Sequence, residues 1–439
     1  MNVLIHTWVV SYSRGSEFAI TYDYIKEMSR YHHLYVVVNS CSYKLDDLSE
    51  FSNMSFDNCE WIFIEPDFWL RVLRRLEKIP DPIKGWVKYL YWDAWEKKVY
   101  KHIKRNYLNK IDIIHYLGPG GNHEAGYLWK LDKPYIWGPT NGFFNIPQCV
   151  LQNYVSNKGV FRIKNILNTI SVYTDIKRRK AFRKADVIIA GMKCDANFIL
   201  EKFKVNKVLY YPENTIHIYE KDILSEDKII GKYDCLLTKN EKIIVVWCGA
   251  LTSRKMPNLL LDSISTLKNK ERFSFQIIGG GELLDYVNSR VEKLVELGYD
   301  VKVFGQIDRE RVMQCFKEAH LHIITSAHEG NPTVVSEAME NCVPSIALHV
   351  CGMADTVTNN NGTSIQVNNY PQLVSDIANA LDGYADNPQI LLSKSLQLRR
   401  DLFEHTLDGK MRFFNSVYDY SVNKQNKDLL LENEVKSFQ

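Results

Sequence analysis

The chain has 439 residues, of which 45% are hydrophobic and 24% charged, and its formal net charge is +3. This length and mixed composition suit two or three domains with sizeable cores and exclude a disordered chain. No apolar run reaches the roughly 18 residues that a membrane-spanning helix needs, and the first ten residues lack a basic leader and a cleavage site. The nine cysteines form no C-x-x-C pair, so we expect a reduced, cytoplasmic protein without structural zinc.

The charge is unevenly distributed along the chain. Residues 1–215 carry 31 Lys and Arg against 22 Asp and Glu, whereas residues 216–439 carry 24 against 30. The basic excess clusters in residues 68–110, with 12 basic and 4 acidic residues among many Trp and Tyr, and in residues 161–184. Such a pattern suits an anionic membrane surface. Solvated helices whose aromatic side chains lie in the core fit as well, and no recognition motif supports nucleic acid.

The first half of the chain alternates between apolar strand-like runs and helical stretches. Strands are predicted at residues 3–10, 111–115, 134–139, 185–190 and 208–211, and a helix at about residues 18–30. Glycine-rich turns follow several of these strands, and open α/β sheets bind ligands beyond the carboxyl ends of their strands. His115 lies at such an end, although a single His there is more often structural.

The second half repeats this alternation. Residues 216–240 are polar and lack strong periodicity, so we expect the connection between two domains there. The next run, residues 242–249, is typical of a parallel strand buried on both faces. Further strands are predicted at residues 274–278, 321–325 and 345–348, and helices at residues 257–268, 333–340, 371–381 and 391–420. The glycine turn at residues 279–281 is not a complete G-x-G-x-x-G fingerprint, which argues against a dinucleotide oxidoreductase.

The most informative turn lies between the strand at residues 321–325 and the helix at residues 333–340. Asn331 is the predicted N-cap and Pro332 the first helical residue, so free backbone amides and the positive end of the helix dipole face the turn. Such a helix start is a place to bind phosphate.

Two carboxylates, Glu329 and Glu337, lie on either side of this turn. Because carboxylates repel phosphate, we expect them to accept hydrogen bonds from hydroxyl groups on either side of a diphosphate.

The segment E-G-N-P-T-V-V-S-E resembles the E-x7-E signature of retaining glycosyltransferases of family 4, which have the GT-B fold. The resemblance implies that Glu329 contacts the donor sugar and Glu337 the ribose. It also implies that the residues of the turn surround the donor, namely Gly330, Asn331, Pro332 and Thr333.

Other segments resemble the same family. G-A-L-T-S-R-K after the strand at residues 242–249 resembles its G-x-L-x-x-x-K element, which implies that Arg254 and Lys255 hold the donor diphosphate. D-I-I-H resembles D-x-x-H, which implies that His115 meets the donor sugar near the reacting centre. The remaining implied donor contacts are Gly249, Gly279, Gln306 and Gly15, and W-G-P-T-N-G resembles a family segment that implies an acceptor side at Asn141 and Gly142.

The expected architecture is therefore α/β, with two Rossmann-like domains facing a cleft and a C-terminal helix crossing back to the first domain. The expected parts are an acceptor-binding domain at residues 1–215, a linker at 216–240, a nucleotide-sugar donor domain at 241–400, a returning helix at 401–421 and a polar tail at 422–439.

The resemblance implies a retaining glycosyltransferase of hexosyltransferase type that moves a sugar from a nucleotide diphosphate, with UDP-sugars favoured, to a hydroxyl of a glycan or a polyprenyl- or other lipid-linked acceptor. Glu329, His115, Lys255 and Arg254 are the implied catalytic residues. No D-x-D motif stands out, and neither a metal nor a cofactor is expected. We expect no nucleic-acid partner, and a role in bacterial surface polysaccharide or lipopolysaccharide biosynthesis, in the cytoplasm or at the inner face of the membrane.

Two other functions remain open at this stage. A nucleotide-sugar epimerase shares the GT-B architecture, and a non-catalytic partner subunit would keep the fold without turnover. The sugar, the acceptor, the linkage and the oligomeric state do not follow from the sequence.

Overall fold

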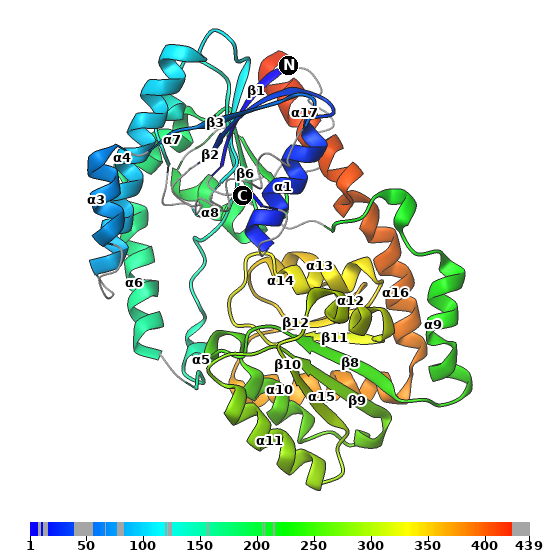
Figure 1. Ribbon diagram of the computed structural model, residues 1–439. Coiled ribbons are helices and arrows are strands. Elements are labelled where there is room, and N and C mark those ends of the chain that lie inside the picture. Colours follow the sequence, from blue (N-terminus) through cyan, green and yellow to red (C-terminus); the bar gives the residue numbers. More distant parts are fainter. Residues whose placement is uncertain are drawn as a thin grey trace. The chain divides into compact units, whose positions relative to one another are not determined.

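The computed structural model divides the chain into two compact units (Figure 1). The first comprises Met1–Phe143, Ser171–Glu213 and the chain from Met411, and the second comprises Phe144–Ile170 and Asn214–Lys410. The structure describes residues 1–7, 10–11, 16–38, 56–65, 67–76, 83–118, 121, 125–155, 158–203, 205, 207–213 and 216–423.

The first unit is built on a parallel sheet of seven strands in the order β3-β2-β1-β4-β5-β6-β7. These are β1 (Asn2–His6), β2 (His33–Val38), β3 (Cys59–Phe63), β4 (Ile113–Tyr116), β5 (Tyr135–Thr140), β6 (Val187–Ala190) and β7 (Val208–Tyr210). The chain runs outward from β1 through β2 to β3 and then returns to β4 on the other side of β1. The topological switch point, where such sheets bind ligands, therefore lies between β1 and β4.

Helices cover both faces of this sheet because neighbouring side chains of each strand point to opposite faces. Leu4 packs with the helices of one face, and Val3 and Ile5 pack with those of the other. The first face bears α3 (Phe68–Leu76), α4 (Ile83–Asn106), α7 (Ile176–Lys184) and α8 (Lys193–Phe203), and the second bears α1 (Ser16–Met28) and α17 (Leu407–Asn423).

Helix α17 comes from the end of the described chain and still belongs to the first core. Its Phe414, Val417 and Tyr418 are buried against α1, and the hydroxyls of Tyr24 and Tyr418 lie 2.6 Å apart. Figure 1 shows the two helices, blue and red, beside each other. The helical stretch expected at residues 391–420 is interrupted by a 3-10 turn, Leu402–His405, between α16 (Gln389–Asp401) and α17.

The aromatic residues of the basic region 68–110 divide between core and surface. Tyr91, Trp92 and Trp95 of α4 are buried in the first core, which is what the core interpretation predicts for them. Phe68 and Trp69 at the start of α3 are exposed.

The second unit has a parallel sheet of six strands in the order β10-β9-β8-β11-β12-β13. Its strands are β8 (Ile243–Cys248), β9 (Phe273–Ile278), β10 (Val301–Gly305), β11 (Leu321–Ile324), β12 (Ser345–Leu348) and β13 (Thr363–Ile365). The switch point of this sheet lies between β8 and β11. Together the two sheets confirm the expectation of an α/β chain with two Rossmann-like sheets.

Helices also enclose the second sheet, and Figure 1 shows α10 and α11 on one side of it and α12 and α13 on the other. The helices of this unit, these four included, are α5 (Gln148–Leu151), α9 (Glu226–Thr238), α10 (Pro257–Ile264), α11 (Leu284–Glu296), α12 (Arg309–Glu318), α13 (Thr333–Glu340), α14 (Cys351–Thr356), α15 (Tyr370–Asp386) and α16. Helix α6 (Lys158–Thr174) begins in the second unit and ends in the first. Residues 216–240, expected as a connection, include α9, which packs against α16.

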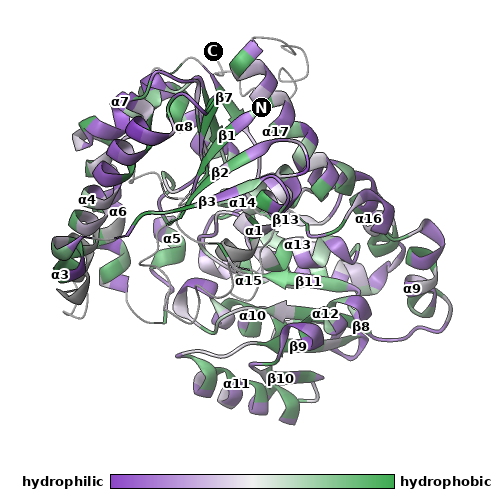
Figure 2. Ribbon diagram, turned by 45° about the horizontal axis from the view of Figure 1, so that its top comes forward, coloured by the Kyte–Doolittle hydropathy of each residue, from purple (hydrophilic) through white to green (hydrophobic). Residues whose placement is uncertain are grey.

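Figure 2 shows the apolar residues of both units concentrated in the strands, with polar residues on the outer helical surfaces. Among the described residues, no helix combines the length and the apolar character needed to cross a bilayer.

Candidate functional site

The turn between β11 and α13 lies at the switch point of the second sheet, because β11 neighbours β8. Helix α13 begins at Thr333, and Pro332 is its N-cap with extended backbone angles. The predicted N-cap at Asn331 is therefore wrong by one residue. The backbone ψ of Pro332 is 125°, and its carbonyl accepts the first hydrogen bond, from the amide of Val335 at 3.0 Å. The helix start still faces the turn, as expected.

The carboxylate of Glu329 lies between two cations. Its Oε1 accepts a hydrogen bond from Arg254 Nη1 and lies 2.8 Å from Lys255 Nζ. The side chains of Lys255 and Glu329 are only 13% and 12% exposed, so water screens this pair weakly. Arg254 also donates to the carbonyl of His328 at 2.9 Å. The structure thus brings together three of the residues that the resemblance implied for catalysis.

Buried hydrogen bonds hold the two loops in this arrangement. The hydroxyl of Thr325 donates to the carbonyl of Lys255 at 2.8 Å and accepts from the indole N–H of Trp247 at 3.0 Å. The amide of Ala327 donates to the carbonyl of Arg254 at 3.0 Å. The loop after β8 is therefore fastened to the end of β11, and the cations depend on that contact for their position.

The turn also packs closely against the start of α14. A Cβ placed on Gly352 would lie 1.5 Å from the carbonyl oxygen of Gly330, and the amide of Gly352 donates to the carbonyl of Glu329 at 3.3 Å. Only glycine allows two backbones to approach this closely. The absence of a side chain at residue 352 therefore lets the turn that carries Glu329 pack directly against α14.

The predicted glycines at the other strand ends lie against one another. A Cβ on Gly279, whose φ is +138°, would lie 1.9 Å from the carbonyl oxygen of Gly249. The Cβ of Gln306 would be 3.7 Å from one built on Gly280. Gly249, Gly279 and Gln306 therefore line adjoining strand ends in the second unit, on the loops next to Lys255.

Glu337 projects from the second turn of α13 and is 8% exposed. Burial raises the pKa of its carboxyl, against the opposing charge of Arg309, and Glu340 raises it further. Arg309 Nη2 lies 3.9 Å from Glu337 Oε1. The carboxylate of Glu337 is buried, and its ion pair with Arg309 is long. Its oxygens can therefore still accept hydrogen bonds from a ligand.

Replacing Glu337 by glutamine is expected to raise the thermal midpoint at pH 7. The folded-state pKa is raised, so the wild-type carboxylate is destabilising once the pH exceeds that pKa, and the cost is absent below the ordinary value of 4.5. The gain should therefore shrink towards zero as the pH falls below 4.5. Thermal melts at several pH values, with exposed Glu296→Gln as control, measure this, and a lower midpoint for Glu337→Gln at pH 7 would contradict it.

Two aromatic residues near this turn, His328 and Tyr154, have no functional signal in the sequence. His328 Nε2 lies 3.1 Å from the carbonyl oxygen of Phe144, and burial lowers the pKa of its ring. Tyr154 is 1% exposed, and the charges of Arg254 and Glu329 act on its phenol, whose pKa burial raises. Neither belongs to a motif, and Tyr154 is 175 residues from Glu329 in the sequence, so no local signal identified it.

His115 lies in the core of the first unit. Its Nδ1 is 3.0 Å from the hydroxyl of Tyr24 and 2.8 Å from that of Tyr418, and its Nε2 is 2.6 Å from the carbonyl oxygen of Gly138. The side chain is fully buried, and both ring nitrogens have partners within the unit. These contacts tie β4 to α1, α17 and β5, which is a structural role.

The predicted acceptor-side residues are also engaged within the first unit. Asn141 Nδ2 donates to Glu213 Oε2 at 2.7 Å, and the amide of Gly142 donates to Asp195 Oδ2 at 2.8 Å. They form the turn after β5. Gly15, the remaining predicted residue, lies outside the described residues.

A buried pair at the switch point of the first sheet had no sequence signal. His6 Nε2 at the end of β1 lies 3.1 Å from Glu96 Oε1 of α4, and both side chains are fully buried. The hydroxyl of Tyr116, at the end of β4, donates to the same oxygen at 3.2 Å. The pair is 90 residues apart in sequence, so only the fold brings it together.

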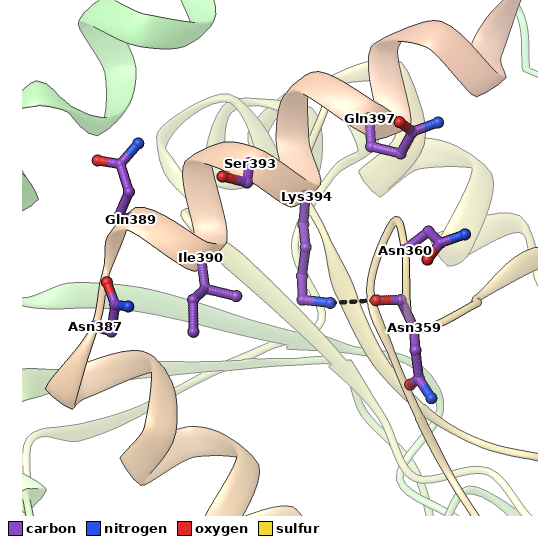
Figure 3. A pocket seen from close by; sticks show the side chains of 8 residues that line it. All are labelled: Asn359, Asn360, Asn387, Gln389, Ile390, Ser393, Lys394 and Gln397. Carbon is purple, nitrogen blue, oxygen red and sulfur yellow. Dashed lines mark hydrogen bonds between the residues drawn. The ribbon is translucent and has the colours of Figure 1, made fainter.

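A hollow of about 520 Å³ lies beside α16 and contains none of the predicted site residues (Figure 3). Lys394 crosses it to donate to the carbonyl of Asn359 at 2.6 Å. Its lining is mostly carboxamide side chains, namely Asn359, Asn360, Asn387, Gln389, Ile390, Ser393, Lys394 and Gln397. It is separate from the turn before α13.

Residues 235–391 match the family model of glycosyl transferases group 1, and this range includes Arg254, Lys255, Glu329 and Glu337. No curated protein matches the chain.

Solved structures resemble the whole chain at low sequence identity. Anabaena Alr3699/HepE in complex with UDP has a TM-score of 0.60 at 14% identity, covering 95% of this chain and 100% of that one. Sucrose-phosphate synthase from Thermosynechococcus elongatus has a TM-score of 0.62 at 16% identity, covering 97% and 100%. WaaG, a glycosyltransferase involved in lipopolysaccharide biosynthesis, has a TM-score of 0.53 at 14% identity, covering 94% and 99%. The chain therefore has the GT-B fold, and its residues 235–391 match the glycosyl transferases group 1.

Proposed function

We propose that the protein is a retaining glycosyltransferase that transfers a sugar, of hexose type, from a nucleotide diphosphate to a hydroxyl of a glycan or lipid-linked acceptor. The observation that carries the proposal is the cluster of Glu329, Arg254 and Lys255 at the switch point of the second sheet. A weakly screened lysine and a partly exposed arginine beside a helix start suit a diphosphate.

The donor engages this cluster by exchanging ion pairs. The diphosphate takes the place of Glu329 beside Lys255 and Arg254, which leaves the carboxylate to accept a hydrogen bond from a sugar hydroxyl. Glu337, whose carboxylate is buried and raised in pKa, accepts a hydrogen bond from the ribose. The glycine contacts at Gly249 and Gly279 keep side chains away from these strand ends.

The chemistry follows from where charge develops. The bond between the anomeric carbon and the diphosphate oxygen breaks, and its electron pair leaves with the diphosphate. The acceptor oxygen attacks the same face of the sugar, and its proton passes to the departing phosphate. Arg254 and Lys255 stabilise the charge that grows on that phosphate, which is the largest contribution we assign to the protein. Orientation of donor and acceptor supplies the remainder, and the scheme needs no metal or cofactor.

UDP is the favoured nucleotide of the proposal, and surface polysaccharide or lipopolysaccharide synthesis at the inner face of the cytoplasmic membrane is the proposed setting. Support comes from relatives of the same fold, since Alr3699/HepE is in complex with UDP and WaaG is involved in lipopolysaccharide biosynthesis. The acceptor is proposed by chemical class alone.

A panel of UDP-, GDP-, ADP- and CMP-linked sugars tests the donor site by thermal stabilisation. One nucleotide class should stabilise the protein and so raise its melting midpoint. At a ligand concentration 100 times its Kd, the free energy of unfolding should rise by about 2.7 kcal/mol. Lys255→Ala and Glu337→Ala should abolish the shift, and exposed Lys268→Ala should keep it.

The same panel separates the competing functions. Conversion of a nucleotide sugar in the absence of acceptor identifies an epimerase, and donor binding without turnover on any glycan or lipid-linked acceptor identifies a partner subunit. No shift with any nucleotide, or equal shifts in the two site variants and the wild type, would contradict the assignment of the donor site.

A further inference from the structure

Helix α6 turns several polar side chains toward the protein and exposes several aliphatic ones. Its Asn165 pairs with the backbone of Ile146, accepting from the amide at 3.2 Å and donating to the carbonyl at 3.0 Å. Asn168 and Thr169 hydrogen-bond with the side chain of Asn145 at 3.0 and 3.1 Å. The inward side of α6 thus carries these polar side chains together with Phe161, which packs against Tyr154, and the buried Val172, whereas most surface helices place mainly apolar residues there.

The opposite side of α6 exposes a continuous aliphatic stripe. The spacing of three and four residues places these side chains on one face of the helix. Their exposed fractions are 53% for Val160, 59% for Ile163, 59% for Ile166, 58% for Leu167 and 50% for Ile170. Tyr173, 61% exposed, extends the stripe at the carboxyl end. Scattered exposed aliphatics are ordinary, but a contiguous apolar face on one helix marks an interaction surface.

The charges around the stripe indicate what covers it. Lys158 and Arg162 are exposed, and residues 158–174 contain no acidic residue. Basic residues beside an apolar helical face, with a Tyr at one end, are the pattern of a helix lying in the headgroup region of an anionic bilayer.

We propose that α6 docks the protein on an anionic lipid bilayer, with its aliphatic stripe in the acyl boundary and its cations among the lipid phosphates. The proposal goes beyond glycosyl transfer, because it needs neither donor nor acceptor. It narrows the membrane expectation for residues 161–184 to one helix and leaves out the region 68–110, where Trp92 and Trp95 of α4 are core residues.

A second copy of the chain is the main competing occupant of the stripe. A symmetric contact between two copies of α6 would bring their like-charged edges together, since the same surface serves both partners. Neither edge of the helix offers an acidic residue to offset that repulsion. The observed charges therefore favour a bilayer over self-association.

Flotation of the full chain with lipid vesicles tests the proposal. Vesicles with about one third phosphatidylglycerol in phosphatidylcholine should carry the protein, and binding should weaken at high salt because headgroup charges are screened. Ile163→Asn combined with Leu167→Asn should lower vesicle affinity by about tenfold or more, since two buried aliphatic side chains are lost. Arg162→Glu should lower it by at least about fivefold on anionic vesicles.

A matched variant controls for lost stability and general surface change. Ile230→Asn with Leu237→Asn removes two exposed aliphatics from α9 and should leave vesicle binding unchanged. All variants should retain the wild-type melting midpoint within a few degrees and any nucleotide-induced shift. Failure of the wild type to float, or equal flotation of the α6 and α9 variants, overturns the proposal. So does a dimer in solution that the α6 variant dissociates while vesicle binding persists.

Discussion

Replacing Lys255 by alanine is expected to lower the rate of sugar transfer by about 100-fold or more, the size of effect that follows loss of one preorganised charge-stabilising group. Lys255 Nζ lies 2.8 Å from Glu329 at 13% exposure, so its charge acts in a weakly screened place. Because Lys255 also binds the donor diphosphate before transfer, KM should rise as kcat falls, so kcat/KM should fall by more than kcat. Steady-state rates with the donor identified by the panel measure both constants.

Two further variants separate the role of the charge from damage to the fold. Lys268→Ala, exposed beyond the end of α10, should keep the wild-type rate. Glu329→Gln removes the carboxylate that competes with a diphosphate for Arg254 and Lys255, so it should bind free UDP more tightly while transferring sugar more slowly. Wild-type turnover by Lys255→Ala, or weaker binding of UDP by Glu329→Gln, would show that these residues do not hold the diphosphate.

The part of the site that could be predicted from the sequence is the part with local determinants. The helix at residues 333–340 and the strand at residues 345–348 have the predicted bounds, because a proline, a helical spacing and an apolar run lie within one short stretch. The predicted N-cap, Asn331, is wrong by one residue because proline, whose φ is fixed, can occupy either the N-cap or the first helical position. The meeting of Glu329 with Lys255 followed from the family resemblance, since 74 residues separate them.

The first unit shows what local patterns cannot supply. His115 lies in β4, one residue before the strand ends at Tyr116, and its side chain faces the α1 and α17 layer, where Tyr418 comes from 303 residues further along the chain. The His6 and Glu96 pair arises in the same way, from strand and helix packing. Side-chain direction and long-range partners determine whether a residue at a strand end faces a ligand or the core, and neither is written in the adjacent sequence.

Replacing Gly352 by alanine is expected to abolish donor binding with no loss of any charged group. The new Cβ would lie 1.5 Å from the carbonyl oxygen of Gly330, so the turn between Glu329 and Asn331 must move. Crowding of this kind costs about 1–3 kcal/mol of stability. The displaced turn carries Glu329 away from Lys255 and Arg254, so the nucleotide-induced thermal shift should be lost as well. Thermal melts with and without UDP measure both effects.

A second glycine makes the test specific. Gly383 lies within α15, and a Cβ there would meet no atom within 4 Å outside its own helix and chain neighbours. Gly383→Ala should therefore stabilise the protein by about 0.5–1 kcal/mol, since alanine favours the helix interior. The same substitution is thus expected to have opposite signs at two helical glycines of one unit. If Gly352→Ala melts and binds UDP like the wild type, the close packing of the turn on α14 is not what positions Glu329.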